Sequence, residues 1–526
     1  MKNTRILSLV MALMMVFSMT LCNVAAAEDA TTVVRVGIDA DVSSISPFGP
    51  MDGGRAYVYQ AIYEYMAQRV AFGASWDAMD LVCAKSITQV DDVTYDIEMY
   101  DYISDSAGNH ITAADYVWAA YAMKESGNYP KMFVLDTIEA TGDYSVRLKI
   151  TDNGLGNLEW LLSMVPIISQ SAYEASADKM VNNPITTAAY QVETFVNGSE
   201  VVLVKAENYW QTDESVRYVW SKQNVDRIEM KIIMDATQMS VALKTNEIDM
   251  AELITPAVLG DFYVDGQATE GWIVDAQPAT MVHSVVFNCS ADSECNNLAL
   301  RQAIGYAIDN ETIMQFATSG YGKVLNAFAN DCASDYIDAW NERDYFGQDL
   351  DKAKALLAES GFDTSQHLKM LVVHSDEYER VAQVIQAQLL EIGIIVDLNV
   401  VDGALQDTEY SISTAWDFGF AARGCDDYCT FPWMLLFNAN GFSSGLNINL
   451  INDPTLQELY MACSSPDTHS EETVAAFEQY LEDQAYGYGL YTGMRYCVAN
   501  SAVCTALDMR EGGEIKIGGC TYVWND

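Results

Sequence analysis

Basic residues are scarce in this sequence. Its 526 residues include 28 lysines and arginines against 74 aspartates and glutamates, so the formal net charge at pH 7 is −46. A charge of this sign and size repels nucleic-acid phosphates and anionic membrane surfaces. The sequence therefore excludes nucleic acid as a partner. The acidic surface chiefly keeps the chain in solution, and it also attracts cationic ligands.

Motifs for metal binding are also missing. No two cysteines have the C-x-x-C spacing of zinc sites, and the five histidines include no H-x-x-x-H pair. H-E-x-x-H, the signature of zinc metalloproteases, does not occur either. We therefore expect no bound metal and no cofactor.

The N-terminus has the pattern of a secretory signal. Lys2 and Arg5 precede a largely apolar stretch, 6–21, and three alanines at 25–27 form a cleavage site. We expect residues 1–27 to be removed and the protein to be extracytoplasmic, in the periplasm or at the cell surface. A lipid anchor on Cys22 is the alternative, although Leu21 is larger than the residue that lipoprotein signals place there. No later apolar run is long enough to span a bilayer.

Cysteine pairing is left open by the sequence. The chain has 11 cysteines, and ten remain once Cys22 is removed. An even number in an exported protein permits disulfides but does not establish them. Candidate partners by sequence proximity are Cys289 with Cys295, Cys425 with Cys429, and the set Cys497, Cys504 and Cys520.

The chain is too long for a single core, and its patterning is of the α/β kind. Two to four domains are expected at this length. Residues 33–38 form a predicted strand, and Thr112 with Asp115 predicts a capping box at the start of a helix. Residues 368–373, 381–392 and 394–400 then predict a strand, a helix and a strand.

One segment is more informative than any other. Residues 298–313 place five apolar side chains at helical spacing and predict one amphipathic helix; these are Leu300, Ala303, Ile304, Ala307 and Ile308. Its pattern R-Q-A-I-x-Y-A-I-D resembles the helix that opens the second lobe of extracytoplasmic solute-binding proteins of the peptide/nickel class, family 5. These proteins bind ligands for ABC importers and carry out no chemistry.

Further pieces of the same family pattern follow in the right order. Residues 62–64, 209–210 and 225–228 resemble its I-Y-E, Y-W and V-D-R-I segments, and 247–249 resembles G-E-I-D. Residues 351–358 and 388–394 are similar to its K-A-K-x-L-L and Q-L-K-x-I-G-I helices. The chain departs from the family at 184–190, where both glycines and the second proline of P-x-G-T-G-P-Y are absent.

The resemblance implies an α/β fold of the periplasmic-binding-protein-like type II, with two lobes in three domains and a hinged ligand cleft. We expect crossovers between the lobes near residues 280 and 502. The implied boundaries are a signal peptide at 1–27, domain I at 28–75, 185–283 and 501–526, domain II as an insertion at 76–184, and domain III at 284–500.

The resemblance also implies a site. Cys425-x-Asp427-Tyr428 resembles the C-A-D-Y of oligopeptide binders, so Asp427 is expected to bind a ligand ammonium, with Asp426 as the fallback. Backbone groups at Cys425 and Arg423 would bond the first ligand residue, and Arg423 either clamps a carboxylate or pairs with Asp426. The remaining candidates either contact ligand or serve the fold, as core or as a turn: Tyr428, Trp416, Ser44, Ile45 and Ser46.

The expected function is to capture di- or oligopeptides and deliver them to the permease and ATPase subunits of an ABC importer. Three alternatives remain. The same fold binds a nickel chelate, a sugar or another small polar metabolite; or the protein is a surface sensor; or it is a secreted hydrolase that uses paired carboxylates such as Asp426 and Asp427. The two carboxylates of a glycosidase face each other across about 5–10 Å, and adjacent residues in one loop do not by themselves have this arrangement.

Overall fold

The computed structural model describes residues 32–50, 54–69, 73, 75–217, 221, 223, 225–343, 345–425, 427–437 and 449–504. The expected signal segment, Cys22, Asp426 and Cys520 lie outside these residues. Within the described part of the chain, no helix combines the length and apolar character needed to cross a membrane.

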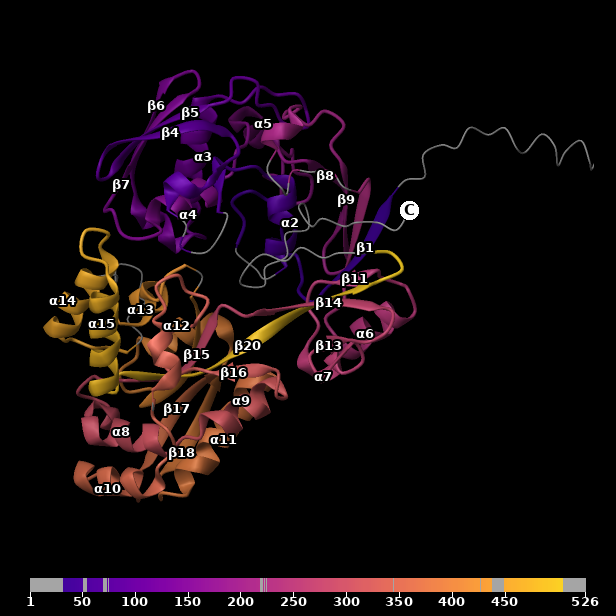
Figure 1. Cartoon of the computed structure of the whole chain (residues 1–526). Helices are drawn as coiled ribbons and strands as arrows, with labels where there is room; N and C mark the ends of the chain where they lie inside the picture. The colour runs from indigo at the N-terminus through magenta and orange to yellow at the C-terminus, as the bar shows by residue number, and fades with distance from the viewer. Residues whose placement is uncertain are drawn as a thin grey trace, which may run out of the picture.

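A long mixed sheet runs through two lobes (Figure 1). Its order is β18-β17-β19-β15-β20-β11-β1-β10-β9-β8, with β14 and β16 also paired to β20. The strands are β1 Val33–Ile38, β8 Tyr190–Val196, β9 Glu200–Lys205, β10 Arg227–Ile232, β11 Met250–Ala251, β14 Trp272–Pro278, β15 Met281–Phe287, β16 Gly322–Val324, β17 His367–Val373, β18 Ile395–Val401, β19 Phe418–Gly424 and β20 Gly487–Asn500.

The N-terminal lobe is built around β1. This strand pairs in parallel with β10 on one side, Val36 opposite Met230, and with β11 on the other, Val36 opposite Met250. Its alternate residues Val34, Val36 and Ile38 are buried, as the period of a strand requires. Three helices complete this lobe: α2 Arg55–Ile62, α6 Ala236–Lys244 and α7 Pro256–Leu259. Helix α2 ends at Ile62, because the chain is extended at Tyr63.

A second sheet lies within the predicted insertion, at the top of Figure 1. It is an antiparallel sheet of order β4-β5-β7-β6, with strands Ala84–Asp91, Thr94–Met99, Ser145–Ile150 and Leu135–Gly142. Three helices accompany it: α3 Ala113–Ser126, α4 Asn157–Met164 and α5 Gln170–Ala175. The predicted capping box is present at the start of α3, where the side chains of Thr112 and Asp115 each accept from the other's backbone.

The C-terminal lobe contains the predicted strand–helix–strand unit. Strands β17 and β18 are parallel, and the helix between them is α11 Asp376–Leu390. Strand β15 has a core on each face: Val285 and Phe287 pack into one cluster, and Val282 and Val286 into the other. The other helices are α8 Leu298–Ala307, α9 Asn310–Thr318, α10 Leu350–Ser360, α12 Gln406–Tyr410, α13 Thr430–Phe437, α14 Pro454–Ser464 and α15 Glu471–Asp483.

The segment 298–313 forms two helices rather than the single predicted one. Ile308 is extended, and Asp309 accepts hydrogen bonds from the backbone N–H of Glu311 and Thr312, which starts α9. The local N-cap therefore outweighs the continuous apolar periodicity. The five apolar side chains that carried the prediction are all buried, as expected.

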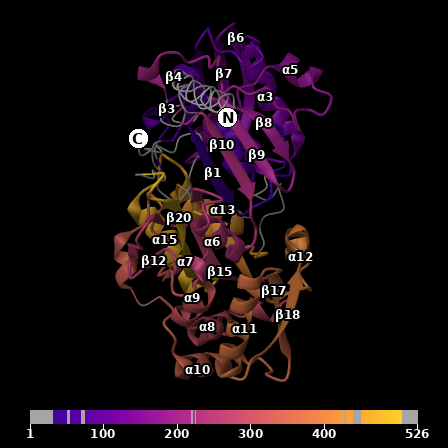
Figure 2. The same cartoon turned by 90° about the vertical axis from the view of Figure 1, so that its right-hand side faces the viewer.

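Two connections join the lobes, which lie one above the other in Figure 2; strands β14 and β20 pass between them in Figure 1. The first leads from β14 through Thr280 into β15. The second lies within β20, whose residues 487–493 pair with β15 and β16 while residues 494–500 pair with β14 and β11. This passage comes earlier in the chain than residue 502, where the sequence placed it, because one long strand serves both lobes.

Of the nine cysteines in the described residues, six are free thiols: Cys83, Cys289, Cys295, Cys425, Cys429 and Cys463. Cys289 with Cys295, and Cys425 with Cys429, are therefore not joined in this structure, although the sequence allowed it. Seven of the nine are buried, so these thiols pack as small apolar side chains.

A buried acid in the N-terminal lobe makes stability depend on pH. Glu64 is buried and accepts hydrogen bonds from Tyr209 Oη at 2.6 Å and Ser221 Oγ at 3.1 Å. Burial raises the pKa of Glu64 from 4.5 to about 7, and the two hydrogen bonds oppose the rise. The folded state therefore binds the proton more tightly than the unfolded state does.

We expect stability to fall as the pH rises from 4.5 through 7, because ionising Glu64 costs about 3 kcal/mol at most. Glu64→Gln keeps an acceptor for both hydroxyls and removes the ionisation. The melting temperature of this variant should change less than that of the wild type between pH 5 and pH 8. The exposed Glu207→Gln is the control. Equal pH dependence in wild type and Glu64→Gln would contradict the assignment.

Candidate functional site

The loop after β19 is held firmly in the C-terminal lobe. The backbone N–H of Cys425 donates to Thr280 O at 2.7 Å, and that of Cys429 donates to Asp335 Oδ1 at 2.7 Å. The backbone oxygen of Asp427 accepts from both the N–H and the Oγ of Ser334, each at 2.9 Å. This loop joins β19 to α13, so its side chains have fixed positions at the edge of the lobe.

Asp427 and Tyr428 reach across to the N-terminal lobe. The Asp427 carboxylate forms an ion pair with Arg69 and accepts a hydrogen bond from Gly73 N at 3.2 Å. Tyr428 Oη donates to Gly73 O at 3.0 Å. The side chains of Arg69 and Asp427 are 13% and 14% exposed, so the pair is mostly shielded from water. Two adjacent residues of one lobe thus bind a short segment of the other.

Glycines allow this close approach. Gly73 has a φ of +65°, and a Cβ there would lie 1.9 Å from Ser334 Oγ and 2.4 Å from Ser334 Cβ. Gly156, with a φ of +72°, faces Asp427 Oδ2 at 3.9 Å from its ideal Cβ position. A side chain at residue 73 would therefore prevent the lobes from meeting as they do.

Arg69 stands near two carboxylates. Glu159, at the start of α4, accepts from Trp76 N at 2.8 Å and lies close enough to Arg69 and Asp427 to interact with both charges. Burial raises the pKa of Glu159, and the positive charge of Arg69 lowers it. One guanidinium therefore lies close to two carboxylates at this contact, an arrangement that favours cations.

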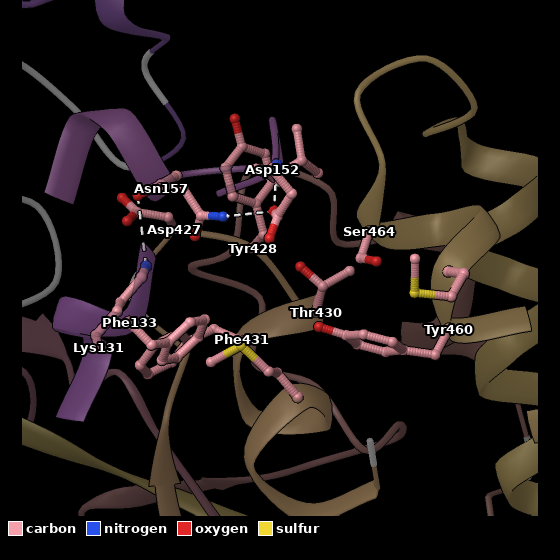
Figure 3. Close-up of a pocket in the computed structure, with 15 residues that line it drawn as sticks. Lys131, Phe133, Asp152, Asn157, Asp427, Tyr428, Thr430, Phe431, Tyr460 and Ser464 are labelled. Carbon is pink, nitrogen blue, oxygen red and sulfur yellow. Dashed lines mark hydrogen bonds between the residues drawn. The ribbon is translucent and has the colours of Figure 1, made fainter. Parts of the chain in front are cut away.

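A cavity of about 260 Å³ lies beside this contact (Figure 3). One wall comes from residues 131–157 of the insertion, and the other from residues 427–464 of the C-terminal lobe. The described lining residues are Lys131, Phe133, Asp152, Gly154, Leu155, Gly156, Asn157, Asp427, Tyr428, Thr430, Phe431, Met434, Tyr460, Met461 and Ser464. A second cavity, of about 270 Å³, shares Gly154, Leu155, Gly156 and Tyr428 with the first.

Two predicted residues, Asp427 and Tyr428, line this cavity. Cys425 lies in the same loop but is buried, and its thiol contacts Tyr428 O at 3.7 Å. Arg423 is on β19, where its Nη1 donates to Ala422 O at 2.9 Å, and it lies near the phenol of Tyr378 on α11. Neither Cys425 nor Arg423 lines the cavity.

The structure does not bring Trp416 to the cavity. Its indole is buried and its Nε1 donates to Tyr410 O at 3.2 Å, so the ring fills the core of the C-terminal lobe. This is the core interpretation that the sequence left open. A buried indole N–H needs an internal partner, and Tyr410 supplies it.

Ser44, Ile45 and Ser46 are buried inside the N-terminal lobe and do not line the cavity either. Ser46 Oγ donates to Lys179 O at 2.8 Å, and Ile45 O accepts from Tyr63 Oη at 3.0 Å. These bonds tie the loop after β1 to the insertion boundary and to α2. The loop therefore stabilises the lobe in this structure.

The residues that the sequence did not single out come from the opposite lobe. None of them belongs to a sequence motif. Each becomes part of the site only because it lies against the loop after β19 or the start of α13; these residues are Arg69, Gly73, Glu159 and Lys131. The left-handed glycines were the one available signal, because a glycine in a loop often marks a close backbone approach.

The fold has two lobes with a cavity between them. Residues 81–443, more than half of the chain, match the family model described as bacterial extracellular solute-binding proteins, family 5 Middle. The chain belongs to family 5 of the bacterial extracellular solute-binding proteins, and the predicted family is thereby confirmed.

Relatives in the family are named as binding proteins. The nickel-binding protein NikA of Staphylococcus aureus is 25% identical over 352 residues, covering 65% of this chain and 67% of the relative. The oligopeptide-binding protein AppA of Bacillus subtilis is 23% identical over 452 residues, covering 78% of each.

Solved structures share the fold. The substrate-binding protein CtaP of an ABC transporter in Listeria monocytogenes is similar with a TM-score of 0.75 at 21% identity, covering 94% of this chain and 99% of that one. AppA of Bacillus subtilis in complex with a nonapeptide has a TM-score of 0.73 at 17% identity, covering 93% and 99%. These similarities confirm the predicted α/β fold of the periplasmic-binding-protein-like type II.

Proposed function

We propose that this protein is the extracytoplasmic binding component of an ABC importer, that it captures di- or oligopeptides between its lobes, and that it delivers them to a membrane permease. The family assignment supports a solute-binding role, and relatives named for oligopeptides and glutathione support a peptide ligand. The proposal includes no enzymatic step.

The observation that carries the proposal is the contact of Asp427 with the opposite lobe. Because this charged group contacts both lobes when they are closed, a ligand that binds to it also affects the closing of the cleft. In our proposal the ligand ammonium takes the place of the Arg69 guanidinium at Asp427 when the lobes open and reclose. Arg69 then remains beside Glu159, whose negative charge compensates it.

A nickel chelate is the second candidate ligand. It is favoured by one observation, the 25% identity to a protein named for nickel binding in Staphylococcus aureus. Among the described residues, no group of three or more His, Cys, Asp and Glu side chains is placed to hold a metal ion. In this alternative the chelating molecule, rather than the protein, would supply most of the metal ligands.

A thermal-shift screen tests the ligand class. We expect peptides of two to six residues to raise the melting temperature progressively with concentration, because a ligand that binds only the folded state stabilises it by mass action. The screen includes nickel with histidine, haem and glutathione as alternatives. A shift with nickel–histidine or haem alone, and none with any peptide, would exclude the peptide proposal.

A further inference from the structure

Both carboxylate oxygens of Asp427 are engaged by the opposite lobe. Its Oδ2 accepts from Arg69 Nη1 in the ion pair, and its Oδ1 accepts from Gly73 N at 3.2 Å. The side chain of Asp427 is only 14% exposed, and two cations beside one shielded carboxylate repel each other. A ligand ammonium therefore reaches Asp427 only by displacing the guanidinium of Arg69.

Arg69 is anchored in the same body as Glu159. It follows directly after β2 Ala67–Gln68, which pairs with β3 Asp80–Leu81. Strand β2 lies against α4, the helix that carries Glu159. Asp427 belongs to the other body, so the separation of Arg69 from Glu159 does not depend on whether the lobes meet, whereas its separation from Asp427 does.

The guanidinium thus has a carboxylate to pair with in each body. The charge of Arg69 acts on Glu159, whose Oε1 is held by Trp76 N at 2.8 Å, and Glu159 also repels Asp427. When Arg69 leaves Asp427 it is therefore not left as an uncompensated charge, which would be strongly unfavourable away from water. A side chain with alternative partners in two moving bodies is a two-state element.

We propose that Arg69 is an internal competitor of the ligand: it pairs with Asp427 and joins the lobes when no ligand cation is present, and it turns to Glu159 when a ligand ammonium takes Asp427. The inference rests on the proposed peptide-binding function and adds how the affinity of that site is set. When only a fraction of the protein is competent to bind, the apparent affinity is lowered by that fraction. Arg69 therefore weakens peptide binding although it lies in the site.

Arg69→Gln tests the competition, because it removes the charge and keeps a polar side chain. Calorimetric titration with tetraalanine should show an affinity roughly fivefold or more above that of the wild type. Without peptide, small-angle scattering should give this variant a larger radius of gyration than the wild type, and peptide should bring both to the same radius. Arg69→Lys keeps a cation and should stay closer to the wild type in both measurements.

Arg147→Gln is the matched control. Arg147 pairs with Asp96 in the insertion at 2.7 Å, and these two side chains are 45% and 40% exposed. The substitution removes the same charge from the molecule without touching the contact between the lobes. It should change neither the affinity for tetraalanine nor the radius of gyration.

Glu159→Gln tests the second partner of Arg69. It keeps an acceptor for Trp76 N and removes the charge that compensates the displaced guanidinium. Affinity for tetraalanine should fall roughly fivefold in the wild-type background and change little in the Arg69→Gln background, since no guanidinium then needs compensation. A merely structural role of Glu159 would give equal losses in both backgrounds. Melting temperatures without peptide verify that each variant is folded.

The proposal is overturned if Arg69→Gln binds tetraalanine no more tightly than the wild type does, because Arg69 then helps to hold the ligand. An unchanged radius of gyration without peptide, or equal losses from Glu159→Gln in both backgrounds, would overturn it as well. If neither tetraalanine nor any other peptide of the thermal-shift screen binds the wild type, the proposed function fails, and the scattering without peptide still decides whether Arg69 joins the lobes.

Discussion

Asp427→Asn should lower affinity for a peptide roughly thirtyfold or more. The substitution keeps the shape of the side chain and removes its charge. Removing one partner of a shielded, hydrogen-bonded charge pair costs about 2–5 kcal/mol, and every 1.4 kcal/mol is about tenfold in the dissociation constant. Calorimetric titration with a peptide that binds the wild type measures the loss.

The fold should survive this change. In the structure the carboxylate of Asp427 is engaged with Arg69 and Gly73 of the opposite lobe, while the loop itself is held by backbone bonds to Thr280, Ser334 and Asp335. Circular dichroism and the melting temperature without ligand should therefore stay close to those of the wild type.

Two controls separate a specific contact from a general acidic field. Asp152→Asn changes an acid that lines the same cavity but is bonded within its own lobe, and Asp426→Asn changes the sequence neighbour. Both should bind nearly as well as the wild type. An N-acetylated peptide lacks the ammonium, so it should bind the wild type poorly and lose little further in Asp427→Asn. Equal losses in all three variants would show that the charges act only collectively.

Gly73→Ala should prevent ligand from closing the lobes. Its Cβ would lie within 2 Å of Ser334 Oγ, and the φ of +65° already disfavours a side chain. The hydrogen bonds of Gly73 with Asp427 and Tyr428 depend on this approach. Overpacking of this kind costs about 1–3 kcal/mol, so affinity should fall roughly tenfold. Small-angle scattering should show that ligand no longer reduces the radius of gyration as it does in the wild type.

Gly127→Ala is the matched control. Gly127 has a φ of +72°, like Gly73, but a Cβ there has nothing within 4 Å. It therefore carries the same backbone penalty without the steric clash, and closure and affinity should be retained. Ser334→Gly removes the atoms that the new Cβ meets, so the double variant should recover part of the closure. If Gly73→Ala closes and binds like the wild type, the contact at Gly73 is not needed for the closed state.

Local features of the fold were predictable because each depends on a short stretch of sequence. The period of two in β1, the capping box at Thr112 and the apolar face of 298–313 are all properties of neighbouring residues. The break between α8 and α9 was predictable in the same way from Asp309, a strong N-cap residue, but the apolar period dominated the prediction.

The candidate site was predictable on one side only. The C-x-D-Y pattern identified Asp427 and Tyr428, which do line the cavity, and it included Cys425, which is buried. For Trp416 the sequence allowed two roles, because the local pattern around an aromatic side chain is the same whether the ring fills a core or faces a ligand. The partner of Asp427 was not predictable, because Arg69 is more than three hundred residues away in the chain and belongs to no motif.

The sequence by itself determined the family, the α/β class and the acidic loop, because each is encoded by residues near one another. Only the tertiary structure decided what that loop meets. The pairing of Asp427 with Arg69, the close approach at Gly73 and the position of Lys131 over Phe431 all join segments from different lobes. Such contacts are set by how two separately folded bodies pack about β20, and the spacing of residues along the chain carries no record of that packing.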